Sequence, residues 1–216
     1  MKRLYLAASI DRTGEDIAKD IKKETGKDPC DLKTVFINTA AEGSISEDKT
    51  WLAQDREGLV KGGLDLFDYT ITNKTPKDLE KDLTDCDVIH VNGGNPFYLL
   101  LQAKKSGFDK WITDQVLKKD KIYIGSSAGT QIIGLDIKIL SRPGTETDEK
   151  KLINLKGSGI IDFLIFPHWG SEKFHDLYFD YRLKFAYKPE NKIILLNNWQ
   201  YVKVVGDTYK IVDIRD

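Results

Sequence analysis

The sequence has few cysteines and few histidines. Its 216 residues include two cysteines, Cys30 and Cys86, which form no CxxC pair and no cluster with a histidine. A disulfide framework and a zinc site are therefore not expected, and the composition is typical of a protein from the reducing cytoplasm. Because the chain has three histidines, only three side chains could serve as an imidazole base.

The sequence also lacks an excess of charge and a long hydrophobic run. Thirty-three basic residues stand against 34 acidic ones, so no overall positive field would attract nucleic acid or an anionic membrane. The apolar run at residues 4–8 ends before Asp11, which is too short for a signal-peptide core or a membrane span. The expected partner is a small molecule or a peptide, and the expected assembly is a monomer or a homodimer.

The hydrophobic pattern predicts an α/β fold. A chain with 40% hydrophobic residues can bury one core, so we expect residues 1–216 to form a single domain. Short runs rich in Val, Ile and Phe alternate with amphipathic segments, which is typical of a mostly parallel sheet with helices on both faces. The expected strands are residues 4–8, 34–37, 64–69, 88–91, 122–124, 163–166 and 193–196. The expected helices are residues 15–22, 49–61, 76–83, 97–104, 110–117, 128–133 and 172–185.

Three local signals refine this pattern. Thr75 followed by Pro76 and Asp78 predicts the start of the helix at 76–83. Residues 199–214 alternate around a central Gly-Asp pair and predict a C-terminal β-hairpin. The polar stretch 142–159 has no convincing periodicity and predicts a surface loop.

The stretch Gly-Ser-Ser-Ala-Gly at residues 125–129 lies between a predicted strand and a predicted helix. It matches Gly-x-Ser-x-Gly, the nucleophile elbow, in which small residues flank a serine at a sharp, strained turn. The hydroxyl of Ser127 would project at the carboxyl edge of the sheet, where the free amides of the following helix could stabilise an oxyanion. A serine that only caps a helix after a strand would give the same pattern, so the motif alone leaves both interpretations open.

A double glycine, Gly93-Gly94, follows the strand predicted at 88–91 and precedes Asn95. Backbone amides here are not shielded by side chains and are candidates for the other half of an oxyanion hole. A plain glycine turn is the alternative. The two turns should meet at one sheet edge, which favours a shared site.

A serine nucleophile needs a base. His90 lies inside an apolar strand and is expected to be a packed core residue with a hydrogen-bonded ring, and His175 lies on a polar, exposed helix. His168 follows the strand predicted at 163–166, at the carboxyl end where open α/β sheets bind ligands. His168 is therefore the predicted base.

Three motifs together carry a family resemblance. They are Val-Asn-Gly-Gly-Asn-Pro-Phe-Tyr-Leu-Leu (91–100), Ile-Gly-Ser-Ser-Ala-Gly-Thr (124–130) and Phe-Pro-His-Trp (166–169). In this order and at these separations they resemble the aspartyl dipeptidase (dipeptidase E) and cyanophycinase family of serine peptidases. The resemblance covers roughly residues 4–196 and implies a glutamine-amidotransferase-like fold, a flavodoxin-like three-layer sandwich. It also implies that Ser127 is the nucleophile, that His168 is the general base, and that the amides of Gly94 and Ala128 form the oxyanion hole.

The chain departs from the family pattern at the triad acid. The family has an Asp or Glu downstream of the nucleophile, and this sequence offers several acids there without a clean match. They are Asp136, Glu146, Asp148 and Glu149. Glu146 or Asp148 is the predicted acid, because Asp136 follows the elbow helix too closely to reach back.

A second departure concerns specificity. Aspartyl dipeptidases carry a paired-arginine motif after the histidine, suited to bidentate capture of a substrate carboxylate. Here only Arg182 has a counterpart, and Phe179 stands in place of the first arginine. We predict that Asn95 and Arg182 contact the substrate and that strict preference for an N-terminal aspartate is absent.

These features predict a cytoplasmic serine peptidase that hydrolyses short peptides through an acyl-enzyme. This chemistry requires no metal and no cofactor. A small serine esterase is one alternative, because the elbow would serve it equally well. A catalytically silent α/β binding protein that retains the elbow is another, because the triad acid has no clear match.

Overall fold

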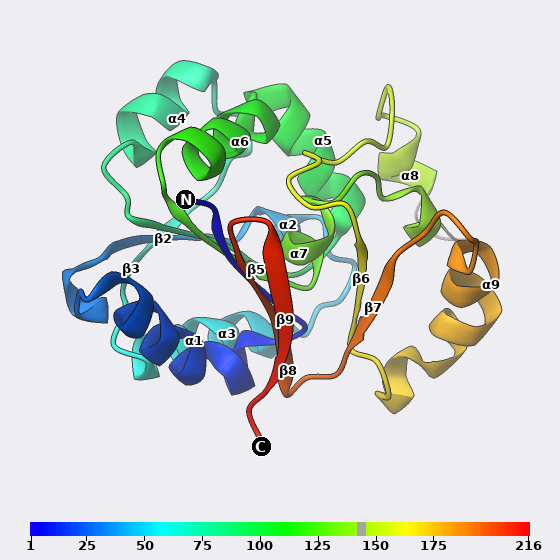
Figure 1. Cartoon of the computed structure of the whole chain (residues 1–216). Helices are drawn as coiled ribbons and strands as arrows, with labels where there is room; N and C mark the ends of the chain where they lie inside the picture. Colours follow the sequence, from blue (N-terminus) through cyan, green and yellow to red (C-terminus); the bar gives the residue numbers. More distant parts are fainter. Residues whose placement is uncertain (142–145) are drawn as a thin grey trace.

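A seven-stranded sheet in the order β3-β2-β4-β5-β1-β8-β9 forms the centre of the molecule (Figure 1). The computed structural model describes residues 1–141 and 146–216. The strands are β1 (Arg3–Ala7), β2 (Lys33–Ile37), β3 (Asp65–Tyr69), β4 (Val88–Val91), β5 (Ile122–Ser126), β6 (Leu164–Pro167), β7 (Ile193–Leu196), β8 (Gln200–Val205) and β9 (Thr208–Asp213). The α-helices are α1 (Ile10–Thr25), α2 (Thr39–Glu42), α3 (Thr50–Lys61), α4 (Pro76–Leu83), α5 (Pro96–Ser106), α6 (Phe108–Lys118), α7 (Ala128–Gln131), α8 (Glu146–Glu149) and α9 (Leu183–Ala186). Shorter helical segments are η1 (Pro29–Asp31), η2 (Lys138–Leu140), η3 (Glu172–Phe174) and the π-helical η4 (Leu177–Arg182).

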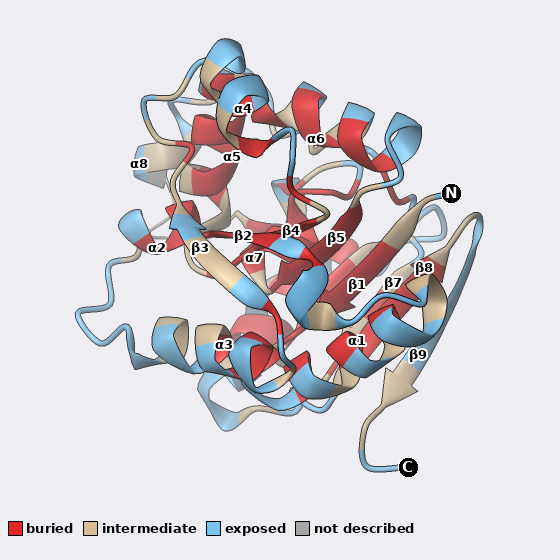
Figure 2. Cartoon of the chain, turned by 90° about the vertical axis from the view of Figure 1, so that its left-hand side faces the viewer, coloured by how far each residue is buried: buried red, intermediate tan, exposed pale blue. Residues whose placement is uncertain are grey.

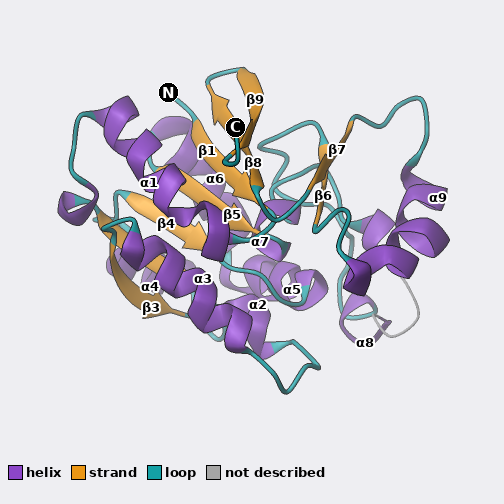
Figure 3. Ribbon diagram, turned by 90° about the horizontal axis from the view of Figure 1, so that it is seen from below, coloured by secondary structure: helices purple, strands orange, loops and turns teal. Residues whose placement is uncertain are grey.

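The sheet is mostly parallel, as predicted. Strands β3, β2, β4, β5 and β1 run in one direction, and β8 pairs antiparallel with β1. The hairpin of β8 and β9 is also confirmed and forms one edge of the sheet. Strands β6 and β7 differ from the expectation, since they pair in parallel with each other in a separate two-stranded sheet (Figure 3). They lie outside the main sheet because β8 occupies the position next to β1.

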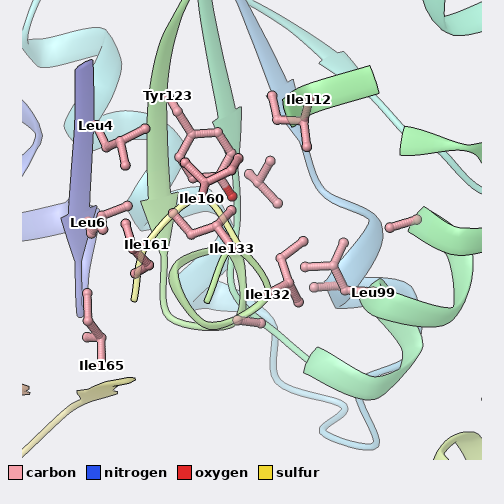
Figure 4. Close-up of a cluster of buried hydrophobic side chains, with 14 of the residues drawn as sticks. Leu4, Leu6, Leu99, Ile112, Tyr123, Ile132, Ile133, Ile160, Ile161 and Ile165 are labelled. Atoms are coloured by element: carbon pink, nitrogen blue, oxygen red, sulfur yellow. The ribbon is translucent and has the colours of Figure 1, made fainter. Parts of the chain in front are cut away.

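Helices cover both faces of the sheet. Helices α1 and α3 lie on one face and α4, α5 and α6 on the other, with their buried sides turned inward (Figures 1 and 2). Alternate residues of β1 serve the two faces: Leu4 and Leu6 belong to one core cluster, and Tyr5 and Ala7 to the other. The larger cluster continues through Tyr123 to the isoleucines around α7 (Figure 4). These apolar side chains pack against α7, the helix that follows the elbow.

Two glycines bring α1 and α3 unusually close. A Cβ on Gly14 would lie 2.6 Å from the backbone of Gly58, and a Cβ on Gly58 would lie 2.4 Å from the carbonyl oxygen of Ile10. Larger residues would push the helices apart. The contact brings Asp55, less than one turn before Gly58, to the N-terminus of α1 beside the end of β5.

Several helices differ from their predicted lengths. The predicted helix 128–133 is only the single turn α7, and beyond it the carbonyls of Ile132 and Ile133 accept from the amides of Ser158 and Ile160. The predicted helix 172–185 is divided into η3, η4 and α9, and the predicted loop 142–159 contains α8. Helix α4 begins at Pro76, and Thr75 before it forms the predicted N-cap, in a capping box with Asp78. No helix in the described part of the chain is long and apolar enough to cross a membrane.

Candidate active site

Ser127 occupies a strained turn between β5 and α7. Its backbone has φ 48° and ψ −103°, a region that residues with side chains rarely adopt. A Cβ on Gly129 would lie 2.0 Å from the carbonyl oxygen of Val91, and one on Gly125 would lie 2.9 Å from the amide nitrogen of Thr130. The amide of Ser127 donates to the carbonyl of Ala7 at 3.1 Å. Only glycine fits at both flanks, which explains the small residues of the motif and gives the geometry of a nucleophile elbow.

His168 reaches Ser127 from the end of β6. The distance between His168 Nε2 and Ser127 Oγ is 3.1 Å. The imidazole stacks on the ring of Phe174, with centroids 4.8 Å apart and planes 12° from parallel. The amide of Trp169 donates to the carbonyl of Leu196 at 2.8 Å, which ties the end of β6 to β7. The histidine selected from the sequence is therefore held on a fixed turn beside the serine.

Asn198 is the partner of the other ring nitrogen. Its Oδ1 lies 2.8 Å from His168 Nδ1. Since an amide oxygen only accepts hydrogen bonds, Nδ1 carries the proton in the neutral ring and Nε2 is free to accept from the Ser127 hydroxyl. The register of β6 and β7 pairs Pro167 with Leu196, so both strands end at the same level. Sequence reasoning missed Asn198, although its position two residues beyond the strand predicted at 193–196 was a usable signal.

The structure does not bring Asp148 to the histidine. Asp148 Oδ2 accepts from Asn95 Nδ2 at 3.1 Å, and its Oδ1 pairs with Lys151 Nζ at 3.1 Å. Helix α8 packs against α5, whereas the His168 ring is bracketed by the ends of β6 and β7. The side chain of Glu146, the other predicted acid, lies outside the described residues.

Burial and local charge set the protonation of His168. Desolvation lowers the pKa of its imidazole below the usual value, and the positive charge of Arg182 lowers this pKa further. The hydrogen bond to Asn198 acts in the opposite direction. The net result is a neutral ring near neutral pH, which is the state that can accept a proton from serine.

The amides of Gly94 and Ala128 are both unpaired within the described residues. Gly94 has φ 135°, and a Cβ there would lie 2.3 Å from the carbonyl oxygen of Ala40. A Cβ on the preceding Gly93 would lie 3.2 Å from that of Ser127, so the double-glycine turn is next to the elbow. The two turns therefore meet at one sheet edge, as expected for strands β4 and β5.

A cavity of about 280 Å³ opens over Ser127 and His168. Trp51, Phe97 and Phe174 contribute aromatic surface to its lining, and Lys173 and Arg182 contribute positive charge. This mixture of apolar wall and few charged groups is typical of a small-ligand site.

Asn95 does not line this cavity. Its Oδ1 accepts from the amides of Phe97 and Tyr98 and caps α5, while its Nδ2 donates to the carbonyl of Gly43 and to Asp148. The side chain is thus engaged in holding α2, α5 and α8 together, and the structure does not place it where the predicted substrate contact requires.

Arg182 and Phe179 point to different places. Arg182 is buried, lines the cavity, and donates from a terminal nitrogen to the Tyr178 hydroxyl at 3.1 Å. Phe179 is 54% exposed and packs against Trp169 and His175 in a separate hollow. The residue at position 179 therefore does not set the polarity of the cavity over Ser127.

Sequence reasoning also missed Asp55. This carboxylate is buried, lines the cavity, and accepts from the Ser126 hydroxyl at 2.7 Å and from the amides of Ile10 and Asp11 at 2.9 and 3.1 Å. Desolvation raises the pKa of Asp55 to about 6, although these three donors oppose the shift. The signal available in the sequence was an acidic residue among the positions of α3 that face the core. Asp55 ties the residue before the nucleophile to the start of α1.

The other two histidines lie away from the nucleophile. His90 is fully buried and stacks on Phe36, but neither ring nitrogen has a hydrogen-bond partner within residues 1–141 and 146–216, unlike the expectation. His175 is exposed and contacts Asp176. Among the described side chains, no group of three or more His, Cys, Asp or Glu is arranged to hold a metal ion.

Comparisons with known proteins agree with this geometry. A family model described as Peptidase family S51 matches residues 6–212. An uncharacterized peptidase from Listeria monocytogenes is 27% identical over 175 residues, covering 81% of this chain and 83% of that protein. An uncharacterized peptidase from Listeria innocua is 30% identical over 66% of this chain and 67% of its own length. Peptidase E from Shewanella oneidensis is 35% identical over 64% of this chain and 54% of its own length.

Two crystal structures share the fold. A protein from Listeria monocytogenes EGD-e, proposed to be a peptidase E, superposes with a TM-score of 0.83 at 23% identity, covering 99% of both chains. A peptidase from an acI-B1 actinobacterium gives a TM-score of 0.68 at 19% identity, covering 99% of this chain and 88% of that one. The match of the family model to almost the whole sequence is the decisive comparison. The chain belongs to peptidase family S51, and it is a serine-type peptidase.

Proposed function

We propose that this peptidase cleaves short peptides through an acyl-enzyme formed on Ser127. The observation that carries the proposal is the chain of hydrogen bonds from Ser127 Oγ to His168 Nε2 and from His168 Nδ1 to Asn198 Oδ1. Nucleophile, base and orienting group stand in the order that acyl transfer requires. Asn198 takes the place of the carboxylate predicted at Glu146 or Asp148.

Each group has one task in the reaction. Ser127 Oγ attacks the scissile carbonyl while His168 Nε2 takes the hydroxyl proton, and Asn198 holds the resulting imidazolium. The amides of Gly94 and Ala128 donate to the oxyanion. His168 then returns the proton to the leaving amine, and a water activated by the same ring releases the acyl group.

The size of the cavity favours short substrates. A volume of about 280 Å³ at Ser127 holds one or two residues rather than a folded chain. Relatives named peptidases favour peptide bonds over carboxylic esters as the physiological target. A single domain over residues 1–216, cytoplasmic location and a monomeric or homodimeric state stay predictions from the sequence.

The test combines labelling and hydrolysis. Ser127→Ala should abolish both fluorophosphonate labelling and cleavage of a dipeptide panel, with a nearly unchanged Tm, because the lost hydroxyl is not packed in the core. Ser46→Ala, a second serine lining the cavity, is the matched control and should keep the label. Hydrolysis of acyl esters with none of the dipeptides would favour an esterase. A wild-type protein that takes no label would favour the silent binding protein.

A further inference from the structure

Asp55 joins the ends of two central strands beside the nucleophile. Strands β1 and β5 pair in parallel, and their last paired residues are Ala7 and Ser126. Asp55 Oδ2 accepts from the Ser126 hydroxyl at 2.7 Å. Its Oδ1 accepts from the amides of Ile10 and Asp11 at 2.9 and 3.1 Å, in the first turn of α1, the helix that follows β1. One carboxylate therefore connects the end of β5 to the segment that leaves β1.

Burying this carboxylate costs free energy, which its three hydrogen bonds offset. Asp55 is 5% exposed, and desolvation raises its pKa to about 6. Ser9, the residue before α1, is of the type that usually caps a helix, yet its side chain makes no capping hydrogen bond. Asp55 supplies the cap from α3 instead, and the N-terminal amides of α1 favour its negative charge. The cap thus comes from a side chain that also reaches β5.

The backbone of Ser127 needs support from its neighbours because it is strained. Its φ of 48° and ψ of −103° belong to a region that persists only where surrounding contacts hold it. The carbonyl of Ala7 accepts from the amide of Ser127 and from Thr130 Oγ1, both at 3.1 Å. These two bonds hold the nucleophile and the helix after it. The bond from Asp55 holds Ser126, the residue before the nucleophile.

We propose that Asp55 is a positioning residue for the nucleophile: acting through the Ser126 hydroxyl, its carboxylate holds Ser127 Oγ in reach of His168 and of the oxyanion hole. The inference rests on the proposed function, in which Ser127 forms the acyl-enzyme. It gives Asp55 no contact with substrate and no proton transfer. A misplacement of about 1 Å can cost a hundredfold in rate, so loss of this link should slow acylation without weakening the binding of a ligand.

The test is the rate at which a fluorophosphonate labels the protein, because this probe reacts with the serine and requires no known substrate. The maximal labelling rate reports the reactivity of Ser127, and the half-saturating probe concentration reports binding. Ser126→Ala removes the link and leaves the cap of α1 in place. It should lower the maximal rate about tenfold and change the half-saturating concentration by less than about twofold.

Two changes at Asp55 separate the hydrogen bond from the charge. Asp55→Asn keeps an oxygen for the two amides of α1 and places an NH2 group against the Ser126 oxygen, which can accept from it. This variant should label within about threefold of the wild-type rate. Asp55→Ala should lose about tenfold or more. Adding Ser126→Ala to Asp55→Ala should lower the rate further by less than about twofold, because both changes break the same link.

Thr75→Ala is the control for a loss of stability alone. It removes the cap of α4, which does not line the cavity, so it should lower the Tm and leave the labelling rate unchanged. An unchanged rate in Ser126→Ala, a rate in Asp55→Asn as low as in Asp55→Ala, or losses that multiply in the double variant would overturn the inference. If Asp55→Ala does not fold, Ser126→Ala and Asp55→Asn still decide. A wild-type protein that takes no label would overturn the proposed function, and this inference with it.

Discussion

Asn198 is a neutral amide at the position where a serine protease triad has a carboxylate, so Asn198→Asp is an informative change. The substitution keeps the size of the side chain and an oxygen 2.8 Å from His168 Nδ1, and adds one negative charge. Charges about 4 Å apart interact by about 4 kcal/mol at an effective dielectric constant near 20. At about 1.36 kcal/mol per unit, this sets an upper bound of about three units on the rise in the His168 pKa. Because Asn198 is only partly buried, we expect a rise of about one to two units.

The assay is the dependence of kcat/KM on pH, whose acidic limb reports the pKa of the base in the free enzyme. In the wild type this limb should lie below the ordinary histidine value of 6.5, because burial lowers the pKa of His168. A proton on Nε2 blocks catalysis, so raising the pKa must move the limb to higher pH. Asn198→Asp should therefore lose activity near pH 6 and keep it near pH 9.

Two controls decide whether Asn198 is the orienting group. Asn197→Asp adds the same charge one residue away, where the side chain accepts from the amide of Trp199, and should move the limb less. Asp148→Asn should not move it, because Asp148 contacts Asn95 and Lys151. An unmoved limb in Asn198→Asp, or a large shift in Asp148→Asn, would refute the assignment of Asn198 and restore the acid predicted in the loop.

Two further predictions test the core and the elbow. Burial lowers the pKa of His90 to about 3, so between pH 6.5 and 3 the unfolded state binds the proton more readily. The free energy of unfolding of the wild type therefore decreases as the pH is lowered through this range. His90→Phe removes this loss and should leave activity unchanged. In urea denaturation, the free energy of unfolding of the variant minus that of the wild type should be about 2 kcal/mol larger at pH 5 than at pH 7. A difference that does not change with pH would contradict the buried, neutral ring. Gly129→Ala should lower stability by about 3 kcal/mol and kcat/KM at least about a hundredfold, because its Cβ would meet the Val91 carbonyl at 2.0 Å. Gly134→Ala, whose Cβ would meet its nearest atom at an ordinary 3.4 Å, is the control, and equal loss in both variants would refute the steric explanation.

Much of the fold and part of the site follow from local sequence. The alternation of apolar runs predicts the parallel sheet, and Thr75 with Asp78 predicts the start of α4, because both depend on residues close together in the chain. The elbow is predictable for the same reason: Gly125 and Gly129 fit only a turn that also places Ser127 at a strand end.

The extent of α7 was not predictable from local pattern. Apolar residues continue beyond Gln131 and extend the predicted helix to 133, but the chain leaves the helix at Gln131, and the carbonyls of Ile132 and Ile133 accept from the amides of Ser158 and Ile160. These partners lie more than 25 residues away in the sequence, and a local pattern contains no information about them.

The sequence by itself determined the α/β fold, the serine at the elbow and His168, because each depends on a strand and the residues that directly follow it. Only the tertiary structure decided that β6 and β7 pair outside the main sheet and so bring Asn198, 30 residues further along the chain, to His168. The packing of α3 on α1 likewise places Asp55 against Ser126, 71 residues away. Hydrophobic patterns specify which segments become strands and helices, but pairing and packing between distant segments specify which polar side chains meet, and catalysis depends on that meeting.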